Sequence, residues 1–74
     1  MKVYGNLIAE IAKRGYTRKE IAESVGLSRT ALANKLNCKT SFKVNELEII
    51  HKKFFEDCEY MYLTELYDRT VKGA

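Results

Sequence analysis

The residues best equipped for chemistry lie between Ser28 and Asn37. If this stretch is a helix of about 3.6 residues per turn, Leu32 and Leu36 share one side of it. The opposite side carries an arc that consists of Arg29, Thr30, Ala33, Asn34 and Asn37. Arginine can donate two hydrogen bonds to guanine, asparagine pairs with adenine, and a methyl group fits against thymine. The arc therefore predicts a helix that reads base edges in DNA, and the alternative is a surface helix solvated by small polar residues.

The distribution of charge also points to a polyanion. The chain of 74 residues has a formal net charge of +3. Residues 1–41 hold eight basic and three acidic residues, whereas residues 42–74 hold five basic and seven acidic ones. No acidic residue occurs between Glu23 and Glu46, so the arc has no nearby carboxylate in the sequence. By itself, this asymmetry fits a solvated basic face equally well.

Two short helices are needed to position the arc. Thr17 and Glu20 have the spacing of a capping box, which predicts that a helix opens at Thr17. Gly26 can end that helix sharply, and Ser28 can cap a second helix that runs to about residues 36–37. Two capped helices joined by a turn with one glycine have the form of a helix-turn-helix unit.

The remaining periodicity predicts the other helices of an all-α domain of four or five helices. A first helix is expected over residues 4–14, with Gly15 as its stop. Residues 37–43 are expected to form a loop that Phe42 anchors to the core. Asn45 is expected to cap a fourth helix. The apolar positions in and just before that helix are Val44, Leu47, Ile50 and Phe54.

The C-terminal end has a less regular pattern. Its large apolar and aromatic residues are Phe54, Phe55, Tyr60, Met61, Tyr62, Leu63, Leu66 and Tyr67. Those from Tyr60 to Tyr67 fit a short fifth helix, which we favour, while the alternation at Tyr60, Tyr62 and Thr64 fits a strand. Phe54 and Leu63 are expected in the core. The others exceed what one thin core can cover, so residues 58–74, together with Ile49, are expected to form a dimer contact.

Three stretches of the chain resemble one family of DNA-binding proteins. They are residues 7–15 (LIAEIAKRG), 17–30 (TRKEIAESVGLSRT) and 35–42 (KLNCKTSF), with NEL following at residues 45–47. In helix spacing and in the positions of Ala22, Gly26 and Phe42 they are similar to the lambda-repressor-like family of Cro and repressor proteins of phages and prophages. The resemblance covers about residues 4–63. It implies a helical bundle with the third helix in the major groove, and homodimers that pair through C-terminal segments.

The resemblance also implies roles for single residues. The positions that match Arg29, Thr30 and Asn34 face bases, and the arc adds Ala33. Those that match Arg18, Ser28 and Lys39 lie at a phosphate, at the groove edge and near the DNA backbone. Lys35 can lay its stem along the core and direct its ammonium toward phosphate. The expected phosphate contacts are Arg18, Ser28, Lys35, Asn37 and Lys39.

One departure from the family concerns the loop after the third helix. The family usually has glycine where this chain has Cys38. A left-handed cysteine would cost on the order of 1 kcal/mol. This cost predicts a loop of different shape, with Lys39 pointing elsewhere.

Other classes of function have little support in the sequence. Cys38, Cys58 and a single His51 do not have the spacing of a metal site, and both thiols are expected to be reduced. No Gly-rich phosphate loop or nucleophile–base pair occurs, so we expect neither an enzyme nor a cofactor or small-molecule substrate. No apolar run approaches the roughly 18 residues of a membrane span, and the first residues do not resemble a signal peptide. A cytoplasmic location is expected, without membrane attachment.

We therefore expect residues 1–74 to form a single helix-turn-helix domain. Its expected function is that of a transcriptional regulator, such as a Cro-like repressor, which binds operator DNA as a homodimer. One alternative is a protein-interaction module, antitoxin-like or anti-repressor, that keeps the fold without reading DNA. Another is a DNA binder without sequence preference, which the arginine and asparagine of the arc disfavour.

Overall fold

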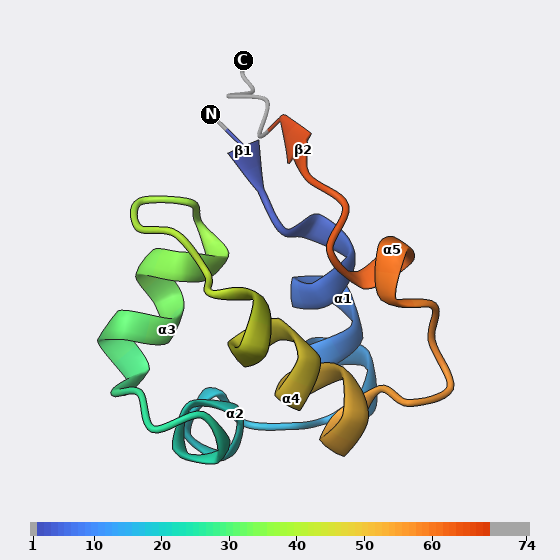
Figure 1. The fold of residues 1–74 in the computed structure, drawn as a ribbon, viewed down its shortest axis with the longest axis horizontal. Helices are drawn as coiled ribbons and strands as arrows, with labels where there is room; N and C mark the ends of the chain where they lie inside the picture. Colours follow the sequence, from blue (N-terminus) through green and yellow to red (C-terminus); the bar gives the residue numbers. More distant parts are fainter. Residues whose placement is uncertain (1, 69–74) are drawn as a thin grey trace.

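The structure is a computed structural model in which residues 2–68 are described. Within this part of the chain, five helices and two short strands follow one another (Figure 1). The elements are β1 (Lys2–Val3), α1 (Gly5–Arg14), α2 (Arg18–Ser24), α3 (Arg29–Leu36), α4 (Val44–Phe54), α5 (Tyr60–Leu63) and β2 (Tyr67–Asp68). The expectation of a mostly helical fold with four or five helices is thus confirmed. None of the helices in residues 2–68 is long and apolar enough to cross a membrane.

The first three helices end in the same way. After each helix, one residue takes a left-handed conformation: Gly15 at φ 74°, Gly26 at φ 73° and Cys38 at φ 60°. The amide of the following residue then donates back to the carbonyl oxygen five residues earlier, near the end of the helix, as in a Schellman motif. These bonds are Tyr16 to Ile11 (3.1 Å), Leu27 to Ala22 (2.9 Å) and Lys39 to Asn34 (2.8 Å). The expectation of a differently shaped loop at Cys38 was wrong, because the cysteine accepts the conformation in which glycine is usual.

The beginnings of α2 and α3 match the predicted caps. The Thr17 hydroxyl accepts from the Glu20 amide at 3.0 Å, and the Glu20 carboxylate accepts from the Thr17 amide at 2.8 Å. The Ser28 hydroxyl accepts from the Ala31 amide at 3.1 Å. Side-chain acceptors therefore satisfy amides that the first turn leaves without helical partners.

The fourth helix begins earlier than the sequence predicts. Lys43, not Asn45, precedes its first turn, and Val44 is its first residue. The reason is the carboxylate of Glu46, which accepts a hydrogen bond of 2.9 Å from the Lys43 amide. Val44 consequently lies at the exposed end of α4, with 66% of its surface accessible, rather than in the apolar stripe.

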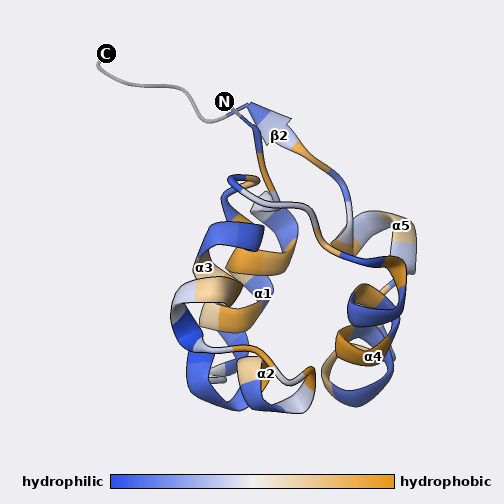
Figure 2. Ribbon diagram, turned by 60° about the vertical axis from the view of Figure 1, so that its left-hand side comes forward, coloured by the Kyte–Doolittle hydropathy of each residue, from blue (hydrophilic) through white to orange (hydrophobic). Residues whose placement is uncertain are grey.

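The core lies between the helices, and each of the five helices contributes at least one buried apolar residue to it (Figure 2 gives the hydropathy along the ribbon). Its buried residues are Leu7, Ile11, Ile21, Ala22, Leu32, Leu36, Ile50, Phe55 and Leu63. Leu63 is buried as expected, and Phe54 packs against this core only in part. Phe55 is fully buried instead. Since α4 ends at Phe54, the helical period no longer decides which aromatic side chain turns inward.

At the C-terminal end the favoured short helix is confirmed, whereas the alternative of a strand through Tyr60, Tyr62 and Thr64 is wrong. A one-turn helix, α5, is followed by β2, which pairs antiparallel with β1 through Lys2↔Asp68 and Val3↔Tyr67. The Tyr67 ring lies so close to Gly5 that a Cβ atom there would come within 3.1 Å of it. The pairing therefore joins the two ends of the described chain. Residues 69–74 of the predicted dimerisation tail lie outside the described residues.

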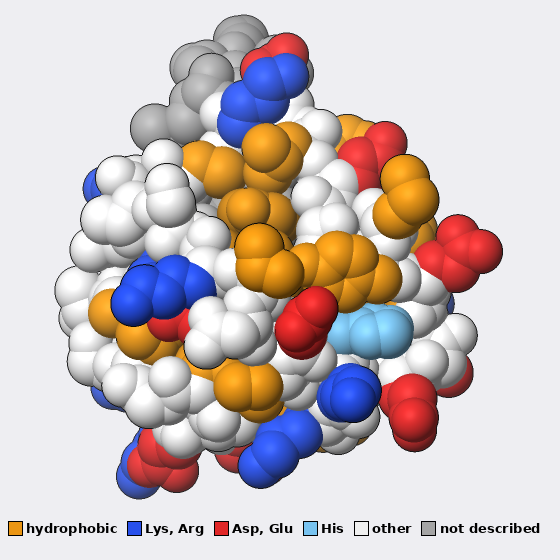
Figure 3. All heavy atoms as spheres, viewed as in Figure 1, with side chains coloured by type: hydrophobic (Ala, Val, Ile, Leu, Met, Phe, Trp, Pro, Cys, Tyr) orange, Lys and Arg blue, Asp and Glu red, His pale blue; other side chains and the backbone are white. Residues whose placement is uncertain are grey.

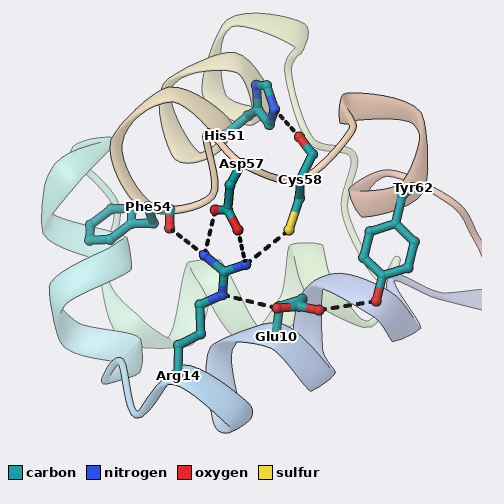
Figure 4. A network of polar contacts seen from close by, with 7 residues as sticks. All are labelled: Glu10, Arg14, His51, Phe54, Asp57, Cys58 and Tyr62. Atoms are coloured by element: carbon teal, nitrogen blue, oxygen red, sulfur yellow. Dashed lines mark hydrogen bonds and ion pairs between the residues drawn. The ribbon is translucent and has the colours of Figure 1, made fainter.

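Arg14 ties α1 to the segment between α4 and α5 (Figure 4). Its guanidinium donates two hydrogen bonds to Asp57, of 2.8 and 2.9 Å, and one of 3.0 Å to Glu10. It also lies 5.2 Å from the centre of the Phe55 ring. The hydrogen bond from Arg14 lowers the pKa of Asp57, and the same bond raises the pKa of Arg14. This clamp holds the chain in place where it leaves α4.

Candidate functional site

The helices α2 and α3 pack on each other around a four-residue connection. Ile21 and Ala22 of α2 and Leu32 of α3 are at most 1% exposed. The small side chain of Ala22 allows a close approach, and its carbonyl oxygen accepts the Leu27 amide that closes the turn. This packing fixes which side of α3 faces outward.

The outward side of α3 carries the predicted arc. Arg29 and Thr30 are exposed, while Ala33 and Asn34 are half-buried. The side chains of Arg29, Thr30 and Asn34 make no hydrogen bond or ion pair with any other residue in the range 2–68. Their donors and acceptors therefore remain available to a ligand.

Three of the predicted phosphate contacts are engaged within the protein, namely Ser28, Asn37 and Lys35. The Ser28 hydroxyl already accepts from the Ala31 amide, although it remains exposed. The Asn37 side chain donates to the Ala33 carbonyl at 3.0 Å, and its oxygen atom is buried without a hydrogen-bond partner among residues 2–68. Asn37 thus closes the end of α3 instead of extending its outward side.

Lys35 is the most strongly engaged of the predicted contacts. Its ammonium lies 2.7 Å from a Glu46 carboxylate oxygen, and the two side chains are only 13% and 9% exposed. It also lies 6.0 Å from the centre of the Phe42 ring. Burial tends to raise the pKa of Glu46, but the hydrogen bonds from Lys35 and from the Lys43 amide outweigh burial and lower it. The charge of Lys35 is therefore directed to α4, and this residue lies outside the candidate site.

Arg18 and Lys39 flank the arc on its two sides in the sequence and are both exposed. Arg18 is the first residue of α2. Lys39 follows Cys38, and its amide is held by the Asn34 carbonyl, so the backbone at Lys39 is fixed to the end of α3. Neither side chain forms an ion pair within residues 2–68.

The site contains two further cations, Lys19 and Lys43, which the sequence prediction did not assign to it. Lys19 lies with Ser28 and Arg29 around a cavity of about 340 Å³ in the corner between α2 and α3, which Glu23 also lines. Lys43 is exposed at the start of α4. Lys43 could have been found from its place in the acid-free stretch. Lys19 needed the structure, because only the packing of α2 on α3 brings it near Arg29.

The histidine and the two cysteines form no metal-binding cluster in the described part of the chain. His51 donates from Nε2 to the Cys58 carbonyl oxygen at 2.6 Å, and both cysteines are free. Residues 2–68 hold no group of three or more histidine, cysteine, aspartate or glutamate side chains that could bind a metal ion.

Comparison of the chain with protein-family models, with curated proteins and with solved structures found no match.

Proposed function

We propose that the chain is a helix-turn-helix protein of the lambda-repressor-like type that binds double-stranded DNA sequence-specifically and regulates transcription. The observation that carries this proposal is the contrast along α3. Arg29, Thr30 and Asn34 keep their polar groups free, while Ser28, Lys35 and Asn37 use theirs within the protein. Free side chains of these types, on a helix held by its opposite side, suit contact with base edges.

The charges around α3 support the same ligand. Arg18 and Lys19 are exposed on α2, and Lys39 and Lys43 are exposed on the loop that follows α3. The nearest carboxylate on the C-terminal side, that of Glu46, is neutralised by Lys35. We propose that these four cations contact phosphates and supply most of the affinity, while Arg29, Thr30, Ala33 and Asn34 supply the specificity.

The proposal is tested first with a labelled duplex of mixed sequence. Fluorescence anisotropy is measured at several salt concentrations, and the logarithm of the binding constant is expected to fall linearly with the logarithm of salt. The matched control is Lys52→Ala, which removes an exposed cation from α4. Lys52→Ala should leave the slope of the logarithm of the binding constant against the logarithm of salt nearly unchanged, whereas Arg18→Ala should make that slope shallower. Absence of binding at low salt would overturn the proposal.

Sequence preference is tested next by selection from a randomised duplex library. Recovery of a shared motif is expected, and its loss with Arg29→Ala would assign the readout to α3. Two copies on two half-sites would place their α3 helices about 34 Å apart along the DNA. Sedimentation of the complex is therefore expected to give two copies per selected duplex. Recovery of no motif would leave a binder without sequence preference and contradict specific readout.

A further inference from the structure

An open groove lies beside α5. It has a volume of about 620 Å³ and is lined by Glu59, Met61, Tyr62, Thr64 and Glu65. Its apolar side chains are exposed to solvent. Met61 is 80% exposed, and four of the five large exposed hydrophobic residues in the range 2–68 are Met61, Tyr62, Leu66 and Tyr67. An exposed apolar patch with a polar rim is typical of an interaction surface.

The rim of this groove is acidic. Residues 54–68 contain five acidic residues and no lysine or arginine. Asp57 is paired with Arg14 and Asp68 with Lys2, whereas Glu56, Glu59 and Glu65 form no ion pair within residues 2–68. Figure 3 shows acidic side chains along the edge of the molecule where α5 lies. The groove thus combines the exposed apolar side chain of Met61 with the unpaired negative charges of Glu59 and Glu65.

The groove is built on a fixed backbone. The Tyr62 hydroxyl donates to Glu10 at 3.1 Å (Figure 4), and the Tyr62 carbonyl oxygen accepts from the Asn6 side chain at 2.8 Å. The Thr64 hydroxyl donates to the Tyr60 carbonyl at 2.9 Å. Met61 and Glu59 have no such contacts within residues 2–68. A partner would therefore meet a preformed wall with an adaptable methionine at its centre, which lowers the entropic cost of binding.

We propose that this groove docks a polypeptide segment of a partner protein in which basic residues flank an apolar side chain. The apolar side chain packs against Met61 and Tyr62, and its basic neighbours pair with Glu59 and Glu65. The groove lies beside α5, and α5 and α3 lie on opposite sides of the molecule in both ribbon views (Figures 1 and 2). Docking there leaves the outward side of α3 free, so this inference does not depend on DNA binding.

A second copy of the chain fits the groove less well. A two-fold contact between two such faces would bring the uncompensated glutamates of one copy against those of the other, which is unfavourable. Contact with the basic side of a second copy would instead cover α3. The charges therefore favour a partner segment that carries its own lysines or arginines.

The test uses a labelled lysine-rich peptide with one leucine and one phenylalanine at its centre, titrated with the full chain in the absence of DNA. The double variant E59K/E65K is expected to bind it about tenfold more weakly. E23K/E48K makes the same change in net charge at two exposed glutamates outside the groove and should bind nearly as the wild type does. Met61→Ser keeps every charge and should weaken binding several-fold.

Three outcomes would overturn the proposal. One is absence of peptide binding at low salt. Another is an equal loss with both double variants, which would indicate attraction to net charge only. The last is a dimer in sedimentation equilibrium that Met61→Ser dissociates, which would assign the groove to a second copy.

Discussion

The Lys35 ammonium donates a hydrogen bond of 2.7 Å to the Glu46 carboxylate and thereby joins α3 to the first turn of α4. The same carboxylate oxygen accepts the Lys43 amide at 2.9 Å. Both ends of the loop over residues 37–43 are thus held, because the Asn34 carbonyl fixes the other end through the Lys39 amide. One buried ion pair therefore removes a cation from the outer surface and positions the loop that carries Lys39.

The first prediction separates Lys35 from Lys39. Lys39→Ala should reduce the salt slope of DNA binding by about 1, because one phosphate contact is lost. Lys35→Met should leave the slope nearly unchanged but lower the free energy of unfolding by about 3 kcal/mol, since it leaves the Glu46 charge buried without its cationic partner. Anisotropy and urea unfolding measure the two quantities. K35M/E46Q should recover part of the stability. A slope that falls equally in Lys35→Met would mean that the ammonium leaves Glu46 to meet phosphate.

The second prediction concerns the left-handed cysteine. Cys38→Gly should raise the free energy of unfolding by about 1 kcal/mol, because glycine adopts a positive φ without a Cβ clash. Cys38→Ala is the matched control, since it removes the thiol and keeps the Cβ atom. It should change stability little in urea unfolding followed by circular dichroism. Equal stabilisation by both variants would assign the effect to the thiol rather than to backbone strain.

The features that the sequence predicted correctly are those governed by near neighbours. The caps at Thr17 and Ser28 and the stops at Gly15 and Gly26 depend on residues at most five positions away. The burial of Leu32 and Leu36 follows from the helical period. Short-range rules are enough here because each involves one turn of helix or one tight turn.

The features that the sequence missed depend on where distant segments meet. Lys35 and Glu46 are eleven residues apart, and nothing in their spacing shows that the two helices bring them together. The strand pair joins residues at opposite ends of the described chain. Phe55 turns inward just beyond a helix end, where periodicity gives no guidance. For the candidate site, the residue types of the arc were predictable, but which polar groups are already used within the protein was not.

The third prediction tests base reading by Asn34. Its side chain has no hydrogen-bond partner within residues 2–68, so Asn34→Ala removes no hydrogen bond of the fold in this part of the chain. On a selected duplex, the variant should lose about 1–3 kcal/mol of binding free energy, and the loss should vanish when one particular base pair is replaced. Arg18→Ala should instead weaken binding equally on all sequences. An equal loss on every duplex with Asn34→Ala would show that Asn34 does not read a base.

The fourth prediction concerns acid stability. Burial raises the pKa of Glu46, but its hydrogen bonds from Lys35 and Lys43 lower it overall, and the hydrogen bond from Arg14 lowers the pKa of Asp57. A carboxyl group whose pKa is lower in the folded than in the unfolded chain stabilises the fold above its unfolded pKa, which is about 4.3 for glutamate and 3.9 for aspartate. That stabilisation is lost as the pH falls below these values. The free energy of unfolding in urea should therefore decline from about pH 5 downward. The decline should be shallower in E46Q/D57N, and an equally steep decline in this variant would show that other carboxyl groups are responsible.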